Sequence, residues 1–150
     1  MIKIFICDVD GTLTDSKVYY SKHGRELLSF NVKDGYGISL LKEKGIRVLF
    51  LSNTKSKIIK QRAKDLKVEY SYTQDKEQVI FNILSRNTYN YDDIAYIGDD
   101  MNDFYFMQYI NIVACPNDAH EEIKKLPNVK VMKRNGGEGC VREFIDYLLS

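Results

Sequence analysis

Short apolar runs alternate with amphipathic segments along most of the chain, and the two kinds differ in length. Four runs have the length and continuous apolar character of strands buried on both faces; they cover residues 2–7, 48–51, 94–97 and 112–115. Five segments carry apolar residues at helical spacing; they cover residues 36–44, 56–66, 76–85, 103–109 and 140–149. This alternation predicts an α/β fold in which helices cover both faces of a parallel sheet.

One segment departs from this alternation. Residues 17–32 hold two β-prone stretches on either side of Gly24, which predicts a β-hairpin that turns near this glycine. Because the hairpin follows the first strand directly, we expect it to project over the carboxyl end of the sheet, where open α/β sheets bind ligands. No linker or repeat interrupts the chain, so residues 1–150 are expected to form a single domain.

Composition and charge favour a globular protein and argue against nucleic-acid-binding and membrane proteins. Hydrophobic residues make up 44% and charged residues 29% of the chain, as in an ordinary globular protein. The 22 basic and 21 acidic residues give a net charge of +1, which argues against a nucleic-acid partner. No stretch approaches the ~20 apolar residues that cross a membrane, so no membrane association is expected. Cys7, Cys115 and Cys140 have no disulfide-like or metal-like spacing, which predicts free thiols and a cytoplasmic location.

Candidate chemistry begins directly after the first predicted strand. Asp8 and Asp10 stand at i and i+2 of extended backbone, so their carboxylates point to the same side. Gly11 allows a sharp turn that brings backbone N–H groups close to an anion. An acidic turn after a strand can be purely structural, because Asp-Gly pairs are common in turns. The position behind a fully apolar strand favours a functional site, since loops at strand ends carry function.

A second acidic cluster follows the strand predicted at residues 94–97; it contains Asp99, Asp100 and Asp103. A single aspartate would suffice to cap a helix at this point. If parallel strands bring Asp8, Asp10 and Asp99 together, their like charges repel strongly, and a divalent cation relieves that repulsion. All the available ligands are oxygens and no His or Cys pair lies nearby, so we expect Mg²⁺ rather than zinc.

Two further polar residues stand at the carboxyl side of successive elements. Ser52 follows the strand predicted at 48–51, where its hydroxyl and the next backbone N–H groups, beginning at Asn53, could hold a phosphate oxygen. Lys76 opens the next predicted helix, where its ammonium could neutralise the same phosphate. Taken singly, each is more typical of a loop serine or a solvated lysine. Their order along the chain with the two acidic clusters favours a phosphate site.

In that order, the residues resemble the four motifs of the haloacid dehalogenase (HAD) superfamily of phosphohydrolases. The chain is similar over nearly its whole length to the capless 3-deoxy-D-manno-octulosonate 8-phosphate phosphatases of that superfamily. The motifs are residues 8–12, Ser52, Lys76 and residues 98–103; the additional marks of the group are Tyr19-Tyr20 and residues 30–35, 96–100 and 136–143. The resemblance implies a three-layer Rossmann-like fold without a cap domain, a hairpin flap at about 16–33 and a C-terminal tail at about 134–150.

The resemblance implies an Mg²⁺-dependent phosphomonoester hydrolase that works through an aspartyl-phosphate intermediate. Asp8 would be the nucleophile. Asp10 would protonate the leaving sugar alcohol and then deprotonate the attacking water. Mg²⁺ would be held by the carboxylates of Asp8 and Asp99 and by the backbone carbonyl of Asp10.

Other residues would support this centre by the same resemblance. The phosphate-binding group would consist of Gly11, Ser52, Asn53 and Lys76. Asp103 and Asp100 would orient Lys76 or metal-bound water.

Members of this group are typically tetramers in which the hairpin and tail of a neighbouring subunit complete the site, which implies a homotetramer here. Tyr19, Tyr20 and Phe30 fit such a contact, although cross-strand packing within one hairpin explains them equally well. Arg25 in the hairpin or Arg142 in the tail could bind the carboxylate of a sugar acid, or either could be a surface charge.

Two stretches bear on the substrate. The glycine-rich residues 136–139 could be a plain flexible loop, but their match to the family's tail favours a role in closing over the substrate. After Ser52, octulosonate phosphatases usually carry Gly-Arg and the related enzymes for nine-carbon keto acid 9-phosphates carry Gly-Glu, whereas this chain has Asn53-Thr54. Thr54 at the selectivity position matches neither pattern. The expected substrate is therefore a phosphorylated sugar acid, either the eight-carbon 8-phosphate or a nine-carbon 9-phosphate.

Three alternatives stay open. A related domain supports tetramer assembly in some sialic acid cytidylyltransferases without catalysis, but the candidate catalytic residues are all present here and 150 residues leave no space for a fused transferase. A signalling receiver domain needs an aspartate at the end of its third strand, where this chain offers Ser52-Asn53. A sugar phosphomutase would use the same nucleophile but usually needs a cap to exclude water. Hydrolysis of a phosphorylated sugar acid is the prediction.

Overall fold

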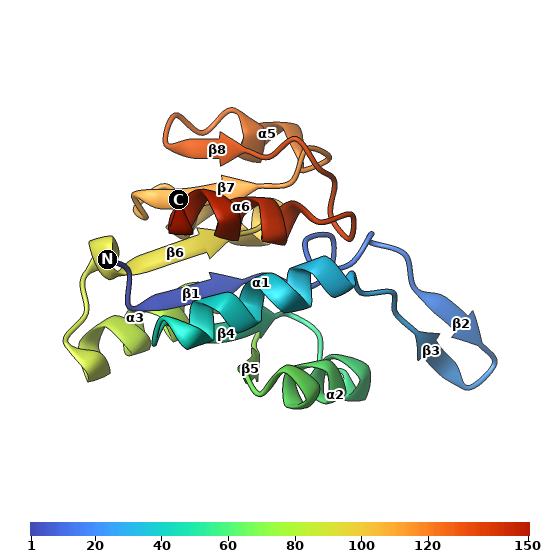
Figure 1. Cartoon of the computed structure of the whole chain (residues 1–150). Helices are drawn as coiled ribbons and strands as arrows, with labels where there is room; N and C mark the ends of the chain where they lie inside the picture. Colours follow the sequence, from blue (N-terminus) through green and yellow to red (C-terminus); the bar gives the residue numbers. More distant parts are fainter.

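The computed structural model describes all 150 residues and confirms the α/β fold without a cap domain (Figure 1). A six-stranded parallel sheet has the strand order β5-β4-β1-β6-β7-β8. Its strands are β1 (Ile4–Cys7), β4 (Arg47–Ser52), β5 (Glu69–Tyr72), β6 (Ile94–Ile97), β7 (Ile112–Cys115) and β8 (Val129–Val131). The helices are α1 (Val32–Glu43), α2 (Lys57–Leu66), α3 (Lys76–Asn87), α4 (Phe104–Met107), α5 (Glu121–Lys124) and α6 (Cys140–Leu149), with single 3-10 turns η1 (Tyr91–Asp93) and η2 (Met101–Asp103). None of the helices combines the length and apolar character that a membrane crossing requires.

The two faces of the sheet bury separate cores. On one face, Phe5 and Cys7 of β1 pack with residues of α1, α2 and α6, and the rings of Phe5 and Phe144 lie 5.8 Å apart. On the other face, Ile4 and Ile6 pack with residues of α3, α4 and α5. Because successive strand residues point to opposite faces, a continuous apolar run supplies both cores at once.

Strand β1 lies in the middle of the sheet and determines where the polar residues meet. It pairs in parallel with β4 on one side and with β6 on the other. The three strands therefore end at the same edge, so Asp8, Ser52 and Gly98 come together although they are distant in sequence. This edge is where ligands bind in open α/β sheets.

The predicted hairpin is present as β2 (Tyr19–Ser21) and β3 (Gly24–Leu27), which are antiparallel. Gly24 at the turn has φ +106°, a backbone conformation that favours glycine. The hairpin extends away from the body of the domain at the carboxyl end of β1 (Figure 1). Tyr19, Tyr20 and Leu27 on it are exposed.

Some elements differ from the sequence prediction for identifiable reasons. Strands β5 and β8 and helix α5 were not predicted, because β5 and β8 are half-exposed or exposed strands without a continuous apolar run and α5 spans only four residues. Helix α1 begins at Val32 instead of residue 36, since the Asn31 side chain caps it by accepting a hydrogen bond from the N–H of Lys33 at 2.8 Å. The helix expected at 103–109 is the turn η2 followed by the short helix α4.

The C-terminal segment is packed into the domain. Helix α6 buries Cys140 and Phe144 in the core against α1. In the preceding loop, the N–H of Gly137 donates to the carbonyl of Thr12 at 3.1 Å. A Cβ at Gly136 would lie 1.9 Å from the carbonyl oxygen of Gly11, so only glycine fits there. Within this chain the loop supports the turn after β1, because its glycines allow backbone to pack directly on backbone. That residues 136–139 close over a substrate stays a prediction.

Candidate active site

A polar hollow of about 540 Å³ lies at the carboxyl end of the central strands. Its lining residues are Asp8, Asp10, Ser16, Val18, Arg25, Asn53, Thr54, Asp99, Asp100 and Asn102. Seven of the residues predicted from the sequence are among them, and they come from the segments after β1, β4 and β6 and from the hairpin. Ser52, Lys76 and Asp103, also predicted, are buried.

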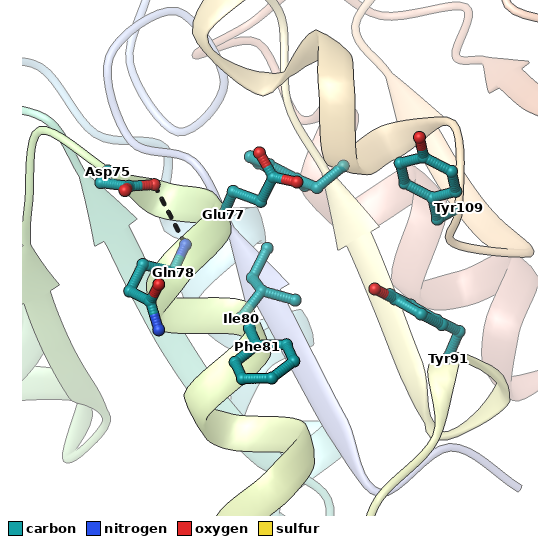
Figure 2. Close-up of a pocket in the computed structure, with 8 residues that line it drawn as sticks. Asp75, Glu77, Gln78, Ile80, Phe81, Tyr91 and Tyr109 are labelled. Atoms are coloured by element: carbon teal, nitrogen blue, oxygen red, sulfur yellow. Dashed lines mark hydrogen bonds between the residues drawn. The ribbon is translucent and has the colours of Figure 1, made fainter.

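Asp8 and Lys76 form a buried ion pair. The backbone N–H of Asp8 donates to the carbonyl of Ile97 at 3.0 Å, which fixes the residue at the end of β1. The Nζ atom of Lys76 lies 2.8 Å from Oδ1 of Asp8. Lys76 is the first residue of α3, and this helix is capped by Asp75, whose carboxylate accepts a hydrogen bond from the N–H of Gln78 at 3.1 Å (Figure 2). The cap fixes the start of the helix and thereby the position of Lys76.

Asp103 completes the surroundings of Lys76. It is fully buried, and its Oδ1 accepts hydrogen bonds from Lys76 Nζ at 2.9 Å and from the Tyr96 hydroxyl at 2.6 Å. Its Oδ2 accepts from the backbone N–H groups of Asp99 at 3.2 Å and Asp100 at 3.4 Å. Both oxygens are thus occupied by protein donors, so Asp103 orients Lys76 and the loop after β6.

Electrostatics keep Lys76 charged. Burial alone would lower the pKa of its ammonium, but the carboxylates of Asp8 and Asp103 outweigh this effect and raise the pKa. Burial and the charge of Asp8 raise the pKa of Asp103, whereas Lys76 and the Tyr96 hydroxyl act to lower it. The arrangement provides a fixed positive charge directly beside Asp8.

Tyr96 is a member of this cluster whose contact the sequence prediction missed. Its side chain is fully buried, and its ring packs edge-on against Phe106 with centroids 4.8 Å apart. It is the single hydroxyl-bearing residue in the otherwise aliphatic strand β6. A lone tyrosine in a buried strand needs a hydrogen-bond partner, and that requirement was the available signal.

Asp8 and Asp99 form a pair of carboxylates suited to a metal ion. The Thr12 hydroxyl lies between them, 3.5 Å from Oδ2 of Asp8 and 3.4 Å from Oδ1 of Asp99. Burial, together with the neighbouring Asp8, raises the pKa of Asp99. A cation between the two groups would offset this unfavourable burial of charge, and carboxylate oxygens are the ligands that Mg²⁺ prefers. Gly11, with φ +85°, is required beside them, because a Cβ there would lie 2.0 Å from Oδ2 of Asp99.

One oxygen each from Asp8, Asp99 and Asp103 lies within 4.8 Å of the others. The protein donors that already occupy both oxygens of Asp103 leave Asp8 and Asp99 as the side chains able to hold an ion. The residues present therefore fit an Mg²⁺ ion at this position.

The end of β4 and the loop after it place Ser52, Asn53 and Thr54 at the same edge. The Oγ atom of Ser52 accepts a hydrogen bond from the N–H of Thr54 at 3.0 Å, which leaves its hydroxyl proton available to a phosphate oxygen. The Asn53 amide donates to the carbonyl of Thr73 at 2.7 Å and also accepts a hydrogen bond from the Asn102 side chain. Asn102, which sequence reasoning did not single out, thereby joins the loops that follow β4 and β6.

Asp10 and Arg25 form the open side of the hollow. Their side chains are 33% and 28% exposed, and Nη1 of Arg25 lies 3.8 Å from Oδ1 of Asp10. Burial raises the pKa of Asp10, whereas the Arg25 guanidinium and the Thr54 hydroxyl act to lower it. A carboxyl group with a raised pKa is suited to donate a proton.

Arg142 is not brought to this chain's own hollow. Its guanidinium Nε donates to Asp146 at 2.8 Å, and the group lies over the ring of Tyr36 at 5.1 Å from the centroid. Its side chain is thus occupied on the helical face formed by α1 and α6.

A second pocket, of about 520 Å³, lies between α3 and the segments that carry Tyr91 and Tyr109 (Figure 2). Figure 2 shows Tyr91 and Tyr109 facing the helix that carries Glu77 and Phe81. Its lining includes two carboxylates, from Asp75 and Glu77, and no lysine or arginine. A phosphate dianion would meet only negative charge there, so the phosphate chemistry belongs to the hollow around Asp8.

Comparisons with known proteins agree with this assignment. No family model matches the chain. The chain is 34% identical over 151 aligned positions to the 3-deoxy-D-manno-octulosonate 8-phosphate phosphatase of Yersinia pestis, covering 99% of this chain and 80% of that protein. The enzyme of that name from Moraxella catarrhalis, solved in complex with magnesium, phosphate and the sugar acid KDO, superposes with a TM-score of 0.93 at 29% identity, covering 99% of this chain and 86% of that one. A Legionella pneumophila protein assigned to subfamily IIIA of the HAD hydrolases gives a TM-score of 0.93 at 34% identity, covering 99% and 82%.

Proposed function

The chain belongs to the 3-deoxy-D-manno-octulosonate 8-phosphate phosphatases of the HAD superfamily, and on this premise we propose that it hydrolyses 3-deoxy-D-manno-octulosonate 8-phosphate with the help of Mg²⁺. The observation that carries the proposal is the contact between Asp8 and the buried cation of Lys76, beside the carboxylate of Asp99. A nucleophile, a fixed positive charge and a metal-binding carboxylate at one strand end are the groups that phosphoryl transfer requires.

Three oxygens would hold the metal ion: the carboxylates of Asp8 and Asp99 and the backbone carbonyl of Asp10. When bound, Mg²⁺ supplies positive charge that shields the phosphate from the negative charge of the nucleophile and polarises the phosphoryl group. The magnesium and phosphate held together by the Moraxella catarrhalis enzyme support this choice of ion.

In the first step, the Asp8 carboxylate attacks the phosphorus atom and the bond from phosphorus to the sugar oxygen breaks. The Asp10 carboxyl group donates its proton to that oxygen, so the sugar leaves as a neutral alcohol. In the second step, the Asp10 carboxylate takes a proton from water, whose oxygen attacks the phosphorus of the aspartyl-phosphate. Inorganic phosphate leaves, and both aspartates return to their initial protonation states.

The remaining residues of the site hold the phosphoryl oxygens in these steps. The Lys76 ammonium and the Ser52 hydroxyl would bind them and stabilise the charge that develops in the transition state. The backbone N–H of Asn53 would contribute in the same way, whereas the N–H of Gly11 donates to the Thr14 hydroxyl oxygen at 3.1 Å. Asp103 and Asp100 belong to the supporting loop, where Asp103 keeps Lys76 in position.

The test is phosphate release, in the presence of Mg²⁺, from three esters at equal concentration: the eight-carbon 8-phosphate, a nine-carbon keto acid 9-phosphate and a hexose 6-phosphate. We expect the highest kcat/KM for the eight-carbon acid. A preference for the nine-carbon acid would establish the second candidate function, which Thr54 keeps open because it matches neither selectivity pattern. Equal low rates would indicate a general phosphatase, and an absence of release would indicate a non-catalytic assembly module.

The assembly and location are part of the proposal. The exposed Tyr19 and Tyr20 on the projecting hairpin support a homotetramer in which the hairpin contacts a neighbouring subunit. Light scattering of the purified protein would measure its mass directly. Three buried free thiols, Cys7, Cys115 and Cys140, support a location in the cytoplasm.

A further inference from the structure

The charges around the hollow are unevenly distributed. Four carboxylates line it, those of Asp8, Asp10, Asp99 and Asp100, but only one basic side chain, that of Arg25. Lys76 lies beneath, with its ammonium already shared between Asp8 and Asp103. A substrate that carries a carboxylate in addition to its phosphate therefore meets one available cation in this hollow.

Arg25 is held in the hollow with hydrogen-bonding capacity to spare. Its Nη1 atom is inaccessible to solvent and has no hydrogen-bond partner. The nearest acidic atom, Oδ1 of Asp10, is 3.8 Å away, which is too far for a hydrogen bond. A buried N–H group without a partner is unfavourable, so Arg25 is held there without a fixed partner of its own. The side chain is nevertheless 28% exposed and lines the hollow, so an oxygen of a bound ligand can meet the accessible part of the guanidinium.

Two other basic side chains, those of Lys55 and Arg142, make their contacts outside the hollow. The ammonium of Lys55 lies over the ring of Tyr72, 5.6 Å from its centroid, and does not line the hollow. Arg142 is paired with Asp146. Arg25 is therefore the residue that brings positive charge to the part of the site beyond the phosphate.

From these observations we infer that Arg25 forms a carboxylate-binding subsite and determines specificity for phosphate esters of sugar acids; this inference rests on the proposed function. The planar guanidinium can donate two parallel hydrogen bonds to a carboxylate, an arrangement that an ammonium cannot reproduce. Because Arg25 lies on β3 of the hairpin, the hairpin itself supplies part of the substrate recognition in its own chain.

The test compares kcat/KM for an ester with a carboxylate and one without. The main pair is 3-deoxy-D-manno-octulosonate 8-phosphate and p-nitrophenyl phosphate. A stricter pair is 6-phosphogluconate and sorbitol 6-phosphate, which differ at one end only, where a carboxylate replaces a hydroxymethyl group. The variants are Arg25→Gln and Arg25→Lys, and the matched control is Lys22→Gln in the exposed turn of the same hairpin. Circular dichroism checks that each variant is folded.

We expect Arg25→Gln to lower the ratio of kcat/KM, acid over non-acid, roughly tenfold to a hundredfold. Arg25→Lys should lower it less, because it keeps the charge but not the planar fork. The Lys22→Gln control should leave the ratio at its wild-type value.

An equal loss on both esters of a pair would overturn the inference, since Arg25 would then act only through Asp10. An unchanged ratio in Arg25→Gln would overturn it as well. Wild-type protein that releases phosphate from none of the esters would overturn the proposed function too, and this outcome is distinct because it is seen before any variant is made.

Discussion

The two halves of the site differ in how tightly they are held. In the buried half, Asp8, Lys76, Asp103 and Tyr96 have almost no exposed surface, and each is held by hydrogen bonds of 2.6–2.9 Å to another member. In the open half, Asp10 and Arg25 are about a third exposed and separated by 3.8 Å. The buried half handles the phosphate, which every substrate shares, whereas the open half meets the part that distinguishes one ester from another. Rigid packing thus suits the binding of the phosphate and the attack by Asp8, and looser surface loops suit the proton transfers by Asp10 and the choice of substrate.

Replacing the nucleophile is the strongest way to test the role of the buried half. Asp8→Asn should lower kcat by more than about a thousandfold, because an amide cannot attack phosphorus. The loss should be equal for substrates with and without a carboxylate. Phosphate-release assays on both kinds of ester measure it, with circular dichroism to establish that the variant is folded. An active Asp8→Asn protein would contradict the proposed mechanism.

Removing the metal ion should abolish catalysis at the same buried site without any substitution. A chelator should reduce turnover at least about a hundredfold, and added Mg²⁺ should restore it. Since the ion would relieve repulsion between Asp8 and Asp99, Mg²⁺ should also raise the melting temperature by several degrees at saturation, roughly as mass action predicts. Asp99→Asn is the matched variant, in which this shift should disappear. Full activity after chelation would rule out the metal.

Tyr96→Phe tests how far the buried network extends. The variant keeps the ring but removes the 2.6 Å hydrogen bond to Asp103. We expect kcat to fall about tenfold with little change in KM, because Lys76 is held less firmly while the substrate contacts remain. Phe106→Leu is the control: it perturbs the same core through the ring contact and should lower stability without lowering kcat. Equal effects on kcat from both variants would indicate a purely structural role for Tyr96.

A substitution in the open half should give a smaller and more selective effect. Thr54→Val preserves the shape of the side chain but removes the hydroxyl, which acts to lower the pKa of Asp10. We expect kcat/KM to change roughly twofold to fivefold, by different factors for different sugar phosphates. Kinetics on the three-ester panel would measure this. A uniform change across the panel would mean that Thr54 does not contribute to selectivity.

The smallest effect on activity is expected at a buried carboxylate outside both halves. Asp34 lies in α1, where Oδ1 accepts a hydrogen bond from the N–H of Arg142 at 2.9 Å and Oδ2 has no partner. Burial raises its pKa to about 6. Between about pH 4 and pH 6 the folded state therefore binds more protons than the unfolded state, so this group's contribution to stability is present below pH 4 and is lost as the pH rises.

Between pH 5 and pH 7.5 the free energy of unfolding should fall by roughly 1–2 kcal/mol. Asp34→Asn should remove this pH dependence of the unfolding free energy while kcat stays at its wild-type value. Denaturant unfolding at pH 5 and pH 7.5 measures both proteins. A parallel pH dependence in the variant would show that Asp34 is not the responsible group.

Sequence reasoning named residues of both halves, but not the contacts that join the members of each half. Four strands were predicted because their apolar runs are local signals. Asp8, Ser52 and Asp99 were found because they stand at the ends of such strands, and Lys76 because it opens a predicted helix. The contact between Tyr96 and Asp103 depends on which face of β6 turns toward α3, and no local pattern specifies that. The approach of Arg25 to Asp10 depends on how the hairpin folds back, which is decided by tertiary packing.

The contacts that the glycine-rich loop and the start of α6 make with Thr12 determine when the active site can form during synthesis of the chain. The Cys140 thiol donates to the carbonyl of Thr12 at 3.3 Å, a contact between residues 128 positions apart. The segment with the nucleophile is therefore synthesised well before the segment that supports it, and contacts so distant in sequence form slowly. Nascent chains that end before Gly136 carry every charged group of the reaction but lack the backbone that supports the turn after β1. Catalytic competence consequently arises only after the segment that contains Gly136 has been synthesised and has packed on the turn after β1.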